Sequence, residues 1–236
     1  MKMKRFKNEK FNNKPAIGRV FKAEAINADT HKLTIYGDIG ESMWGDYVTA
    51  SEVENALNGI DSNHIDVHIN SYGGDVFDGI AIYHTLKDHK ASITTHVDGI
   101  AASAASLIAM AGDKVVMNVG SMLMIHEGST IAWGNKGDIQ KTLNALEKID
   151  QSIGNIYMTK FTGERVDIET MITNETWFTA EEAIDAGFAD NVSEEDTNPA
   201  DPEEVKNAIL DKIRNRKPAP SQNPAPSILN RFKRSE

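Results

Sequence analysis

A run of small residues carries the first candidate for chemistry. Residues 99–112, GIAASAASLIAMAG, contain two serines and no charged side chain. The pattern predicts a strand that ends at Val97, a glycine, and then a helix with Ser103 in its first turn. The helix dipole would stabilise an alkoxide there, and small neighbours would let a substrate backbone approach. Ser106, one turn further, is expected to bond back to a main-chain carbonyl. Rows of alanine and serine also permit tight helix packing, so the run taken alone favours a structural role.

A serine nucleophile needs a base, and His126 is the best placed of the seven histidines. It follows the strand-like residues MLMI, so its side chain can enter a cleft at the carboxyl end of that strand. His64 and His68 have the spacing of a helical metal pair, but their segment alternates like a strand and offers no third ligand. We therefore expect no zinc, no other metal and no cofactor.

Two further segments could complete such a site. In INSYGGDVFDG, residues 69–79, Gly73 and Gly74 lie between a predicted strand and a predicted helix, where exposed amides could hold an anion. The alternative is a plain strand-to-helix turn without a binding role. The segment lacks the sequence patterns of phosphate-binding loops, so a phosphate site is not favoured. In TNETWFTAEEAIDAGFAD, residues 173–190, Thr179 and Glu182 predict a capped helix. Glu175 lies in the turn before that helix, although spacing alone does not select one acid as the partner of His126.

The elements that must position these residues alternate between strands and helices. Strands are expected at 32–37, 65–70, 92–97, 114–118 and 121–127, with helices at 51–60 and 75–89. Successive strand–helix–strand units predict parallel strands with right-handed crossovers, and therefore an α/β fold. Apolar residues at helical spacing from Lys136 to Phe161 predict one helix of about seven turns. It would either lie along its own core or contact another subunit.

The amino-acid composition predicts one folded domain between two terminal segments of different character. Six of the seven prolines lie beyond residue 198. We expect a basic segment at 1–29, a folded domain at 30–192, and a proline-rich, mostly disordered extension at 193–236 with a short helix at about 203–216.

Charge and hydropathy exclude several classes of function. The net charge of -10 argues against a general nucleic-acid-binding protein. The longest apolar run, residues 99–112, is well short of the roughly 20 residues that span a bilayer, so no membrane association is expected. The basic N-terminus lacks the apolar stretch of a secretory signal. We therefore expect a cytoplasmic protein.

Four of these segments, in this order, resemble the proteolytic subunit of the Clp protease, a serine peptidase family of crotonase-like fold. They are INSYGGDVFDGIAIYHTL, GIAASAAS, GSMLMIHEG and TNETWFTAEEAIDAGFAD, and the resemblance covers about residues 30–192. It implies a ClpP/crotonase-like fold of repeated strand–helix units with a protruding handle helix.

Carried onto this sequence, the resemblance assigns a triad and an oxyanion hole. Ser103 becomes the nucleophile, His126 the general base and Glu175 the third member, while the oxyanion amides fall on Gly74, Asp75 and Ala104. The family normally has aspartate where Glu175 stands, and counting from the upstream FTG selects Thr176 instead. Tyr72 replaces the usual proline, and Asp75 replaces the usual apolar residue.

The resemblance also implies partners and a setting. A polypeptide substrate would be cleaved inside a chamber of homo-oligomeric rings, bound as an added strand at a sheet edge. The ETWFTAEEA segment, the INSYGGD turn and the proline-rich extension are similar to phage or prophage proteases that mature the capsid, with capsid or scaffold proteins as partners. The alternatives within the family are a degradative subunit that works with a ring ATPase and an inactive ring-forming structural subunit. Two other enzyme classes are less favoured. An acyl-CoA enzyme of the crotonase type would not need Ser103 and His126, so their occurrence together counts against it. A serine–lysine peptidase would need a buried lysine base and usually a membrane anchor, and no anchor is evident in the sequence.

Overall fold

The computed structural model describes residues 17–40 and 47–193. Most of the basic segment predicted at 1–29 and almost all of the extension predicted at 193–236, including its helix at about 203–216, lie outside the described residues.

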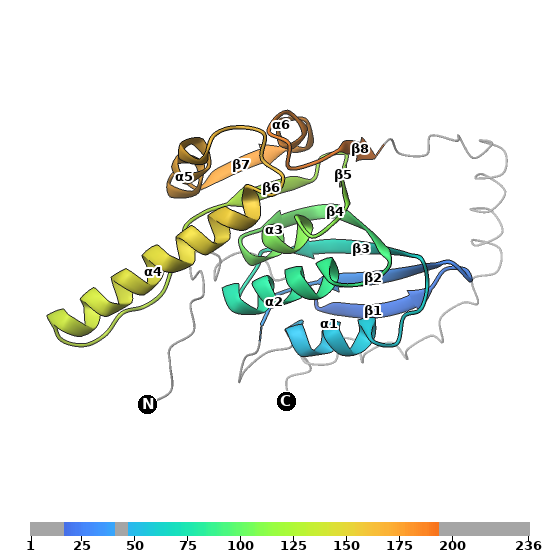
Figure 1. Ribbon diagram of the computed structural model, residues 1–236, viewed down its shortest axis with the longest axis horizontal. Helices are drawn as coiled ribbons and strands as arrows, with labels where there is room; N and C mark the ends of the chain where they lie inside the picture. The colour runs from blue at the N-terminus through green and yellow to red at the C-terminus, as the bar shows by residue number, and fades with distance from the viewer. Residues whose placement is uncertain (1–16, 41–46, 194–236) are drawn as a thin grey trace, which may run out of the picture. The chain divides into compact units, whose positions relative to one another are not determined.

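One eight-stranded sheet organises the described chain (Figure 1). Its strands are β1 Val20–Ala25, β2 Thr30–Tyr36, β3 His64–Ser71, β4 Ser92–Ala102, β5 Lys114–Asn118, β6 Met122–Ile125, β7 Thr176–Thr179 and β8 Asn191–Ser193. The order is β1–β2–β3–β4–β5–β8, with β6 paired to β4 and β7. All pairs are parallel except β1 with β2 and β6 with β7. The predicted α/β class with parallel strands is confirmed.

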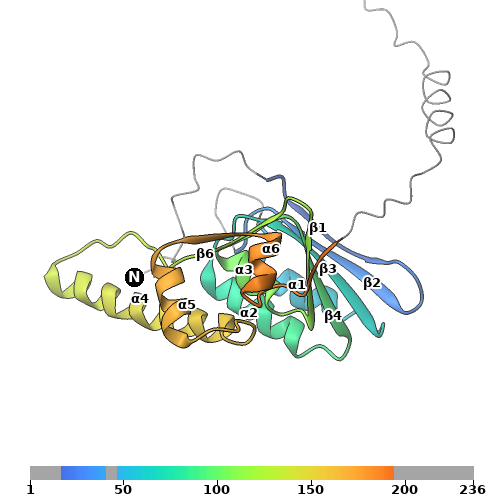
Figure 2. The same ribbon diagram turned by 90° about the horizontal axis from the view of Figure 1, so that it is seen from above.

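The two faces of the sheet differ because side chains alternate along each strand. In β3, Ile65, Val67 and Ile69 are buried, whereas the residues between them are only partly buried. The apolar face is covered by helices α1 Ala50–Leu57, α2 Val76–Lys87 and α3 Ala104–Ala109, as Figures 1 and 2 show. The opposite face carries polar side chains from the same strands.

The sheet begins earlier in the chain than the predicted domain start at residue 30. Strand β1 pairs with β2 along its whole length, from Val20 opposite Tyr36 to Ala25 opposite His31. Most of its residues are exposed, since it is an edge strand, and it therefore lacks the apolar alternation that would have marked it in the sequence.

Strand β4 changes neighbour along its length, and this corrects the prediction that it ends at Val97. Its residues Thr94–Val97 pair with β5, and Ile100–Ala102 pair with β6. Gly99 and the alanines have weak strand propensity, but the hydrogen bonds to β6 override it. The strand therefore runs to the residue before Ser103.

The long helix α4 spans Lys136–Tyr157, slightly shorter than predicted, and begins with a capping box at Asn135 and Asp138. Its buried residues lie in its C-terminal half, whereas Ile139 and Leu143 are about half exposed at 49% and 48%. Figure 1 shows the first half running away from the sheet. The last helices are α5 Arg165–Thr173 and α6 Ala180–Asp185, the second with the predicted Thr179–Glu182 capping box. Within residues 17–40 and 47–193, none of these helices combines the length and apolar character needed to cross a membrane.

Candidate active site

Three parallel strands deliver the candidate residues to one edge of the sheet. Strand β3 leads into Gly73 and Gly74, β4 into Ser103, and β6 into His126. Because β3 and β6 both pair in parallel with β4, their carboxyl ends meet, as in other open α/β sheets with a site at this edge. The Ser103 amide donates to the Met124 carbonyl at 3.0 Å, which joins the turn after β4 directly to strand β6.

Ser103 sits at a strained turn between β4 and α3. Its φ of 55° and ψ of -125° lie in a region that residues with a Cβ rarely adopt, and such strain is concentrated at functional sites. Its hydroxyl makes no capping hydrogen bond to α3. Of residues 101–112, only Ser103 is not buried. The turn thus presents one hydroxyl to the outside of an otherwise buried run.

The glycine turn after β3 packs directly on this serine. A Cβ added to Gly73 would lie 2.6 Å from the Ala102 carbonyl oxygen and 2.8 Å from the Ser103 Cβ. One turn into α2, a Cβ on Gly79 would lie 2.9 Å from the Ala104 Cβ. The small residues on both sides therefore serve close packing as well as access to the serine.

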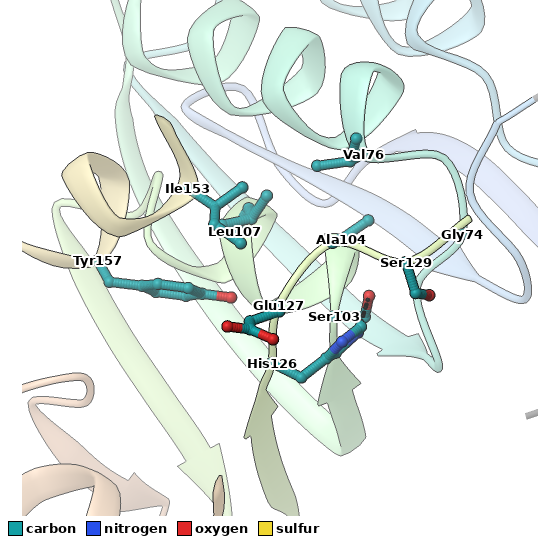
Figure 3. Close-up of a pocket in the computed structure, with 11 residues that line it drawn as sticks. Gly74, Val76, Ser103, Ala104, Leu107, His126, Glu127, Ser129, Ile153 and Tyr157 are labelled. Atoms are coloured by element: carbon teal, nitrogen blue, oxygen red, sulfur yellow. Dashed lines mark hydrogen bonds between the residues drawn. The ribbon is translucent and has the colours of Figure 1, made fainter. Parts of the chain in front are cut away.

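The hydroxyl of Ser103 meets the imidazole that the sequence selected (Figure 3). Ser103 Oγ and His126 Nε2 are 2.7 Å apart, a hydrogen-bond distance across which a proton can pass. Ser106 behaves differently, as predicted: its hydroxyl is buried, donates to the Ser103 carbonyl at 2.6 Å and lies 2.8 Å from the Tyr157 hydroxyl. The structure therefore brings Ser103 and His126 together and leaves Ser106 as a structural residue.

The pairing of β6 with β7 brings the turn at Glu175 to the end of the pair where His126 follows β6. In this antiparallel pair Ile125 lies opposite Thr176, and His126 and Glu175 are the next residues beyond that pair. Glu175 has a positive φ of 51° and its amide donates to Ile172 at 3.2 Å, which forms a turn before β7. The competing position, Thr176, uses its hydroxyl to donate to the Met171 carbonyl at 2.8 Å. The third-member role of Glu175 stays a prediction, and the register favours it over Thr176.

Of the three predicted oxyanion amides, the one at Asp75 is corrected by the structure. The Asp75 amide donates to the Ile39 carbonyl at 2.9 Å, and its carboxylate caps α2 by accepting from Phe77 and Asp78. An amide already paired in this way is not free to hold an oxyanion, so the prediction for Asp75 is wrong.

The amides of Gly74 and Ala104 remain the candidates. Ile39 forms a bridge to this turn through the Gly73 carbonyl and the Asp75 amide. Because successive amides of an extended chain point in opposite directions, the Gly74 amide points away from Ile39. Ala104 is the first residue of α3, and its amide therefore has no acceptor within that helix. Both residues line the pocket that also contains Ser103 and His126.

The pocket beside the serine is lined by apolar side chains and by the chain after His126. Val76, Leu107, Ile153 and Tyr157 supply apolar side chains, and residues 127–129 also line the pocket. Figure 3 shows Glu127 next to Tyr157 and His126, and Ser129 near Gly74. Burial raises the pKa of Tyr157, so its hydroxyl stays protonated. Sequence reasoning did not assign these residues to the site, although Ile153 and Tyr157 recur one turn apart on the buried side of α4.

A second histidine group lies on the polar face of the sheet. His68 Nδ1 is 2.9 Å from Asp98 Oδ2 and His96 Nε2 is 3.1 Å from Asp66 Oδ1. The rings of His68 and His96 stack with centroids 4.6 Å apart. His64 and His68 lie on strand β3, as predicted, and within the part of the chain that the structure describes no three His, Cys, Asp or Glu side chains converge as a metal site would need.

Comparison with known proteins agrees with the geometry. Residues 44–196 match the family model of the Clp protease. The chain is similar to the ATP-dependent Clp protease proteolytic subunit of Deinococcus radiodurans, with 32% identity over 130 residues. That match covers 54% of this chain and 64% of the relative, so the chain spans just under two thirds of the relative's length.

Proposed function

Because this chain belongs to the Clp protease family, we propose that it is a serine-type endopeptidase with Ser103 as nucleophile and His126 as general base. The observation that carries the proposal is the 2.7 Å contact between Ser103 Oγ and His126 Nε2 at a strained strand-to-helix turn. A serine that is neither buried nor used as a helix cap, and that touches an imidazole, has the arrangement required for nucleophilic catalysis.

The proposed reaction is acyl transfer. His126 accepts the Ser103 proton as Oγ attacks the peptide carbonyl, and then returns that proton to the leaving amine. Water takes the place of the amine and releases the acyl group by the same path. Glu175, which precedes β7 at the end of the strand pair where His126 follows β6, is proposed to orient the imidazole and stabilise its protonated form.

The amides of Gly74 and Ala104 are proposed to hold the oxyanion. One such donor typically lowers the barrier by about 3 kcal/mol, because it is fixed in place before charge develops. The Asp75 carboxylate does not oppose this, since it is directed to the amides at the start of α2.

The pocket supports a preference in the substrate. Val76, Leu107 and Ile153 offer an apolar surface next to Ser103, suited to an apolar side chain beside the scissile bond. Of the polypeptides offered to the enzyme, those with Leu, Met or Phe at that position should be cleaved fastest.

A ring assembly is proposed for the same chain. The exposed first half of α4 presents Ile139 and Leu143, and the segment before it presents Ile131 and Trp133 at 54% and 87% exposure. Apolar side chains gathered on a projecting element fit a contact between copies of the chain. Such rings would enclose the serines and limit cleavage to chains that enter.

Two settings are proposed for this peptidase. The resemblance of its INSYGGD and ETWFTAEEA segments supports maturation of a phage or prophage capsid. The name of the Deinococcus relative, an ATP-dependent proteolytic subunit, supports degradation of chains fed by a ring ATPase. Cleavage of co-expressed capsid or scaffold protein without nucleotide would favour the first, and cleavage of an unfolded protein only with an ATPase and ATP would favour the second.

Active-site labelling tests the proposed activity. A fluorophosphonate should modify the wild-type protein at Ser103, as mapped by mass spectrometry, and Ser103→Ala should abolish both labelling and peptide cleavage. Ser106→Ala is the matched control: it removes a hydroxyl three residues away that bonds Tyr157, and should leave labelling at Ser103 in place. Modification at another residue, or none, would refute the assignment.

A further inference from the structure

The chain after His126 is held to the long helix by one carboxylate. Asp150, on α4, accepts the Gly128 amide at 2.7 Å through Oδ1. Gly128 lies two residues after His126 and lines the pocket that contains Ser103. No predicted role in the triad or the oxyanion hole involves Asp150.

We propose that Asp150 is a positioning residue that fixes the pocket wall formed by Glu127, Gly128 and Ser129. The inference rests on the proposed function of Ser103 and His126. Asp150 acts through the wall that a polypeptide substrate must pass, and does not act on the reacting atoms.

The wall needs such support because it has left the sheet. Strand β6 ends at Ile125, and the Glu127 amide donates to the Ile172 carbonyl at 3.2 Å, at the end of α5. The Gly128 amide donates to Asp150 on α4. The segment is thus tied to two different helices, and the stronger tie is the one to the charged acceptor.

Close packing shows that the wall is fitted to α4 at this point. A Cβ added to Gly128 would lie 3.1 Å from Ile149 Cγ2 and 3.5 Å from Leu146 Cδ2. These are the neighbours of Asp150 along the same helix. Loss of the acceptor would therefore remove the hydrogen bond that ties the Gly128 backbone to α4.

The surroundings of Asp150 are strongly acidic. The hollow between α4, α5 and the wall is lined by Glu127, Glu147, Glu169 and Arg165. Arg165 is the cation in this set, and it already binds Glu169 at 2.8 Å and the Gln151 carbonyl at 3.2 Å.

Protonation would weaken this tie. Burial, together with the charges of Glu127 and Glu147, raises the pKa of Asp150 above its ordinary value, while the Gly128 hydrogen bond opposes that rise. A neutral carboxyl is a poorer acceptor than a carboxylate, so the wall should loosen as the pH falls.

Three variants test the inference by comparing a peptide with a small probe. Asp150→Ala removes the acceptor, Asp150→Asn keeps an oxygen acceptor without the charge, and Glu147→Ala removes a nearby charge that does not accept from Gly128. A fluorogenic peptide needs the wall, whereas a small fluorophosphonate needs only Ser103 and His126. Asp150→Ala should lower kcat/KM for the peptide about tenfold and the labelling rate by less than about threefold. Asp150→Asn and Glu147→Ala should remain within about threefold of wild type in both.

Hydrogen exchange and pH provide two further checks, and the pH check does not require Asp150→Ala to be stable. The peptide covering residues 126–130 should exchange faster in Asp150→Ala than in Glu147→Ala. In the wild type, the ratio of peptide cleavage to labelling should fall with falling pH, and in Asp150→Asn it should stay flat, because any effect of pH on the reactivity of Ser103 enters both rates and cancels in the ratio.

The outcomes separate the inference from the function on which it rests. Unchanged peptide cleavage in Asp150→Ala, an equal loss in both readouts, or identical pH dependence of the ratio in wild type and Asp150→Asn would overturn the positioning role while Ser103 still takes the label. A wild-type protein that is neither labelled nor active would refute the proposed function, and the inference would fall with it.

Discussion

His126 and His68 each hold an oxygen at hydrogen-bond distance, but they do so in different surroundings. His126 lies just beyond β6 and meets the hydroxyl of Ser103 at 2.7 Å. His68 lies within β3 and meets the carboxylate of Asp98 at 2.9 Å, on the polar face of the sheet. The second pair has the base and the acid of a triad without its nucleophile.

The difference lies in the regularity of the backbone. His68 is directly opposite His96 in the parallel register, so neighbouring strands present their side chains in flat rows, and the two rings stack. In the described part of the chain, the hydroxyl that reaches Asp98 belongs to Tyr36, and burial together with Asp98 raises its pKa to about 12, which keeps it protonated. At Ser103 the strand breaks into a strained turn at the start of α3. The proposed site for acyl transfer thus differs from the second histidine group by a break in regular structure, since both have a histidine with a partner.

The largest expected effect on catalysis comes from replacing each of the two histidines in turn. His126→Ala should lower kcat for a peptide by about 10⁴-fold, because no base remains for Ser103. His68→Ala should leave kcat within about twofold, since its partners are Asp98 and His96. Steady-state hydrolysis of one fluorogenic peptide, with circular dichroism to confirm folding, measures both. Comparable losses in the two variants would refute the division between the two groups.

Sequence reasoning identified the parts of this site better than the turns that join them. Ser103 and His126 could be found because a small-residue run and a strand-end histidine leave clear local patterns. The positive φ of Ser103 leaves none, because it results from the way β4 passes from β5 to β6. The same pairing explains why the end of β4 was placed too early.

The Asp75 error has a similar physical cause. Asp75 caps α2 with its side chain, but its amide pairs with Ile39, which is 36 positions earlier in the chain. Strand β1 and the pocket residues of α4 were not predicted for the same reason, because both depend on contacts with distant segments. Contacts between distant segments are the part of a fold that local patterns do not encode.

Glycine at the site can be compared with glycine in an ordinary turn, and this gives the second prediction. Gly74 and Gly120 both have positive φ, at 154° and 79°. A Cβ on Gly74 would lie 2.0 Å from the Ile39 carbonyl oxygen, whereas a Cβ on Gly120 would meet nothing within 4 Å. Gly120→Ala should cost about 1 kcal/mol of unfolding free energy from backbone strain alone. Gly74→Ala should cost more than about 3 kcal/mol, because the bridge to Ile39 must also move.

Denaturant unfolding of both variants measures the difference. Gly74→Ala should also lose peptide cleavage, since the proposed oxyanion amide moves with the turn, while Gly120→Ala should retain it. Equal costs for the two substitutions would show that the Gly74 turn can relax, and that its close approach to Ile39 is not needed.

The smallest expected effect separates the pH dependence of stability from that of catalysis. Burial, with the nearby charge of His68, lowers the pKa of His96 below 6.5 in the folded state. The unfolded chain then binds a proton near pH 6.5 that the folded chain resists, so the free energy of unfolding should fall as the pH drops below that value.

Asp98 does not titrate in the same pH range. Hydrogen bonds from His68 and Tyr36 outweigh burial and lower the pKa of Asp98 below 3.8, so its contribution to the free energy of unfolding is full above that value and is lost only at lower pH. Between pH 7 and pH 5 the fall should therefore come from His96 and be well under about 1 kcal/mol, since the ring stays partly solvated. The raised pKa of Asp150 acts in the opposite direction, because the folded chain binds that proton more readily than the unfolded chain. Denaturant unfolding at the two pH values should show a smaller fall in His96→Gln than in wild type, and the full wild-type fall in Ser103→Ala. A fall that disappears in Ser103→Ala would place the titrating group at the active site and remove the distinction between the two histidine groups.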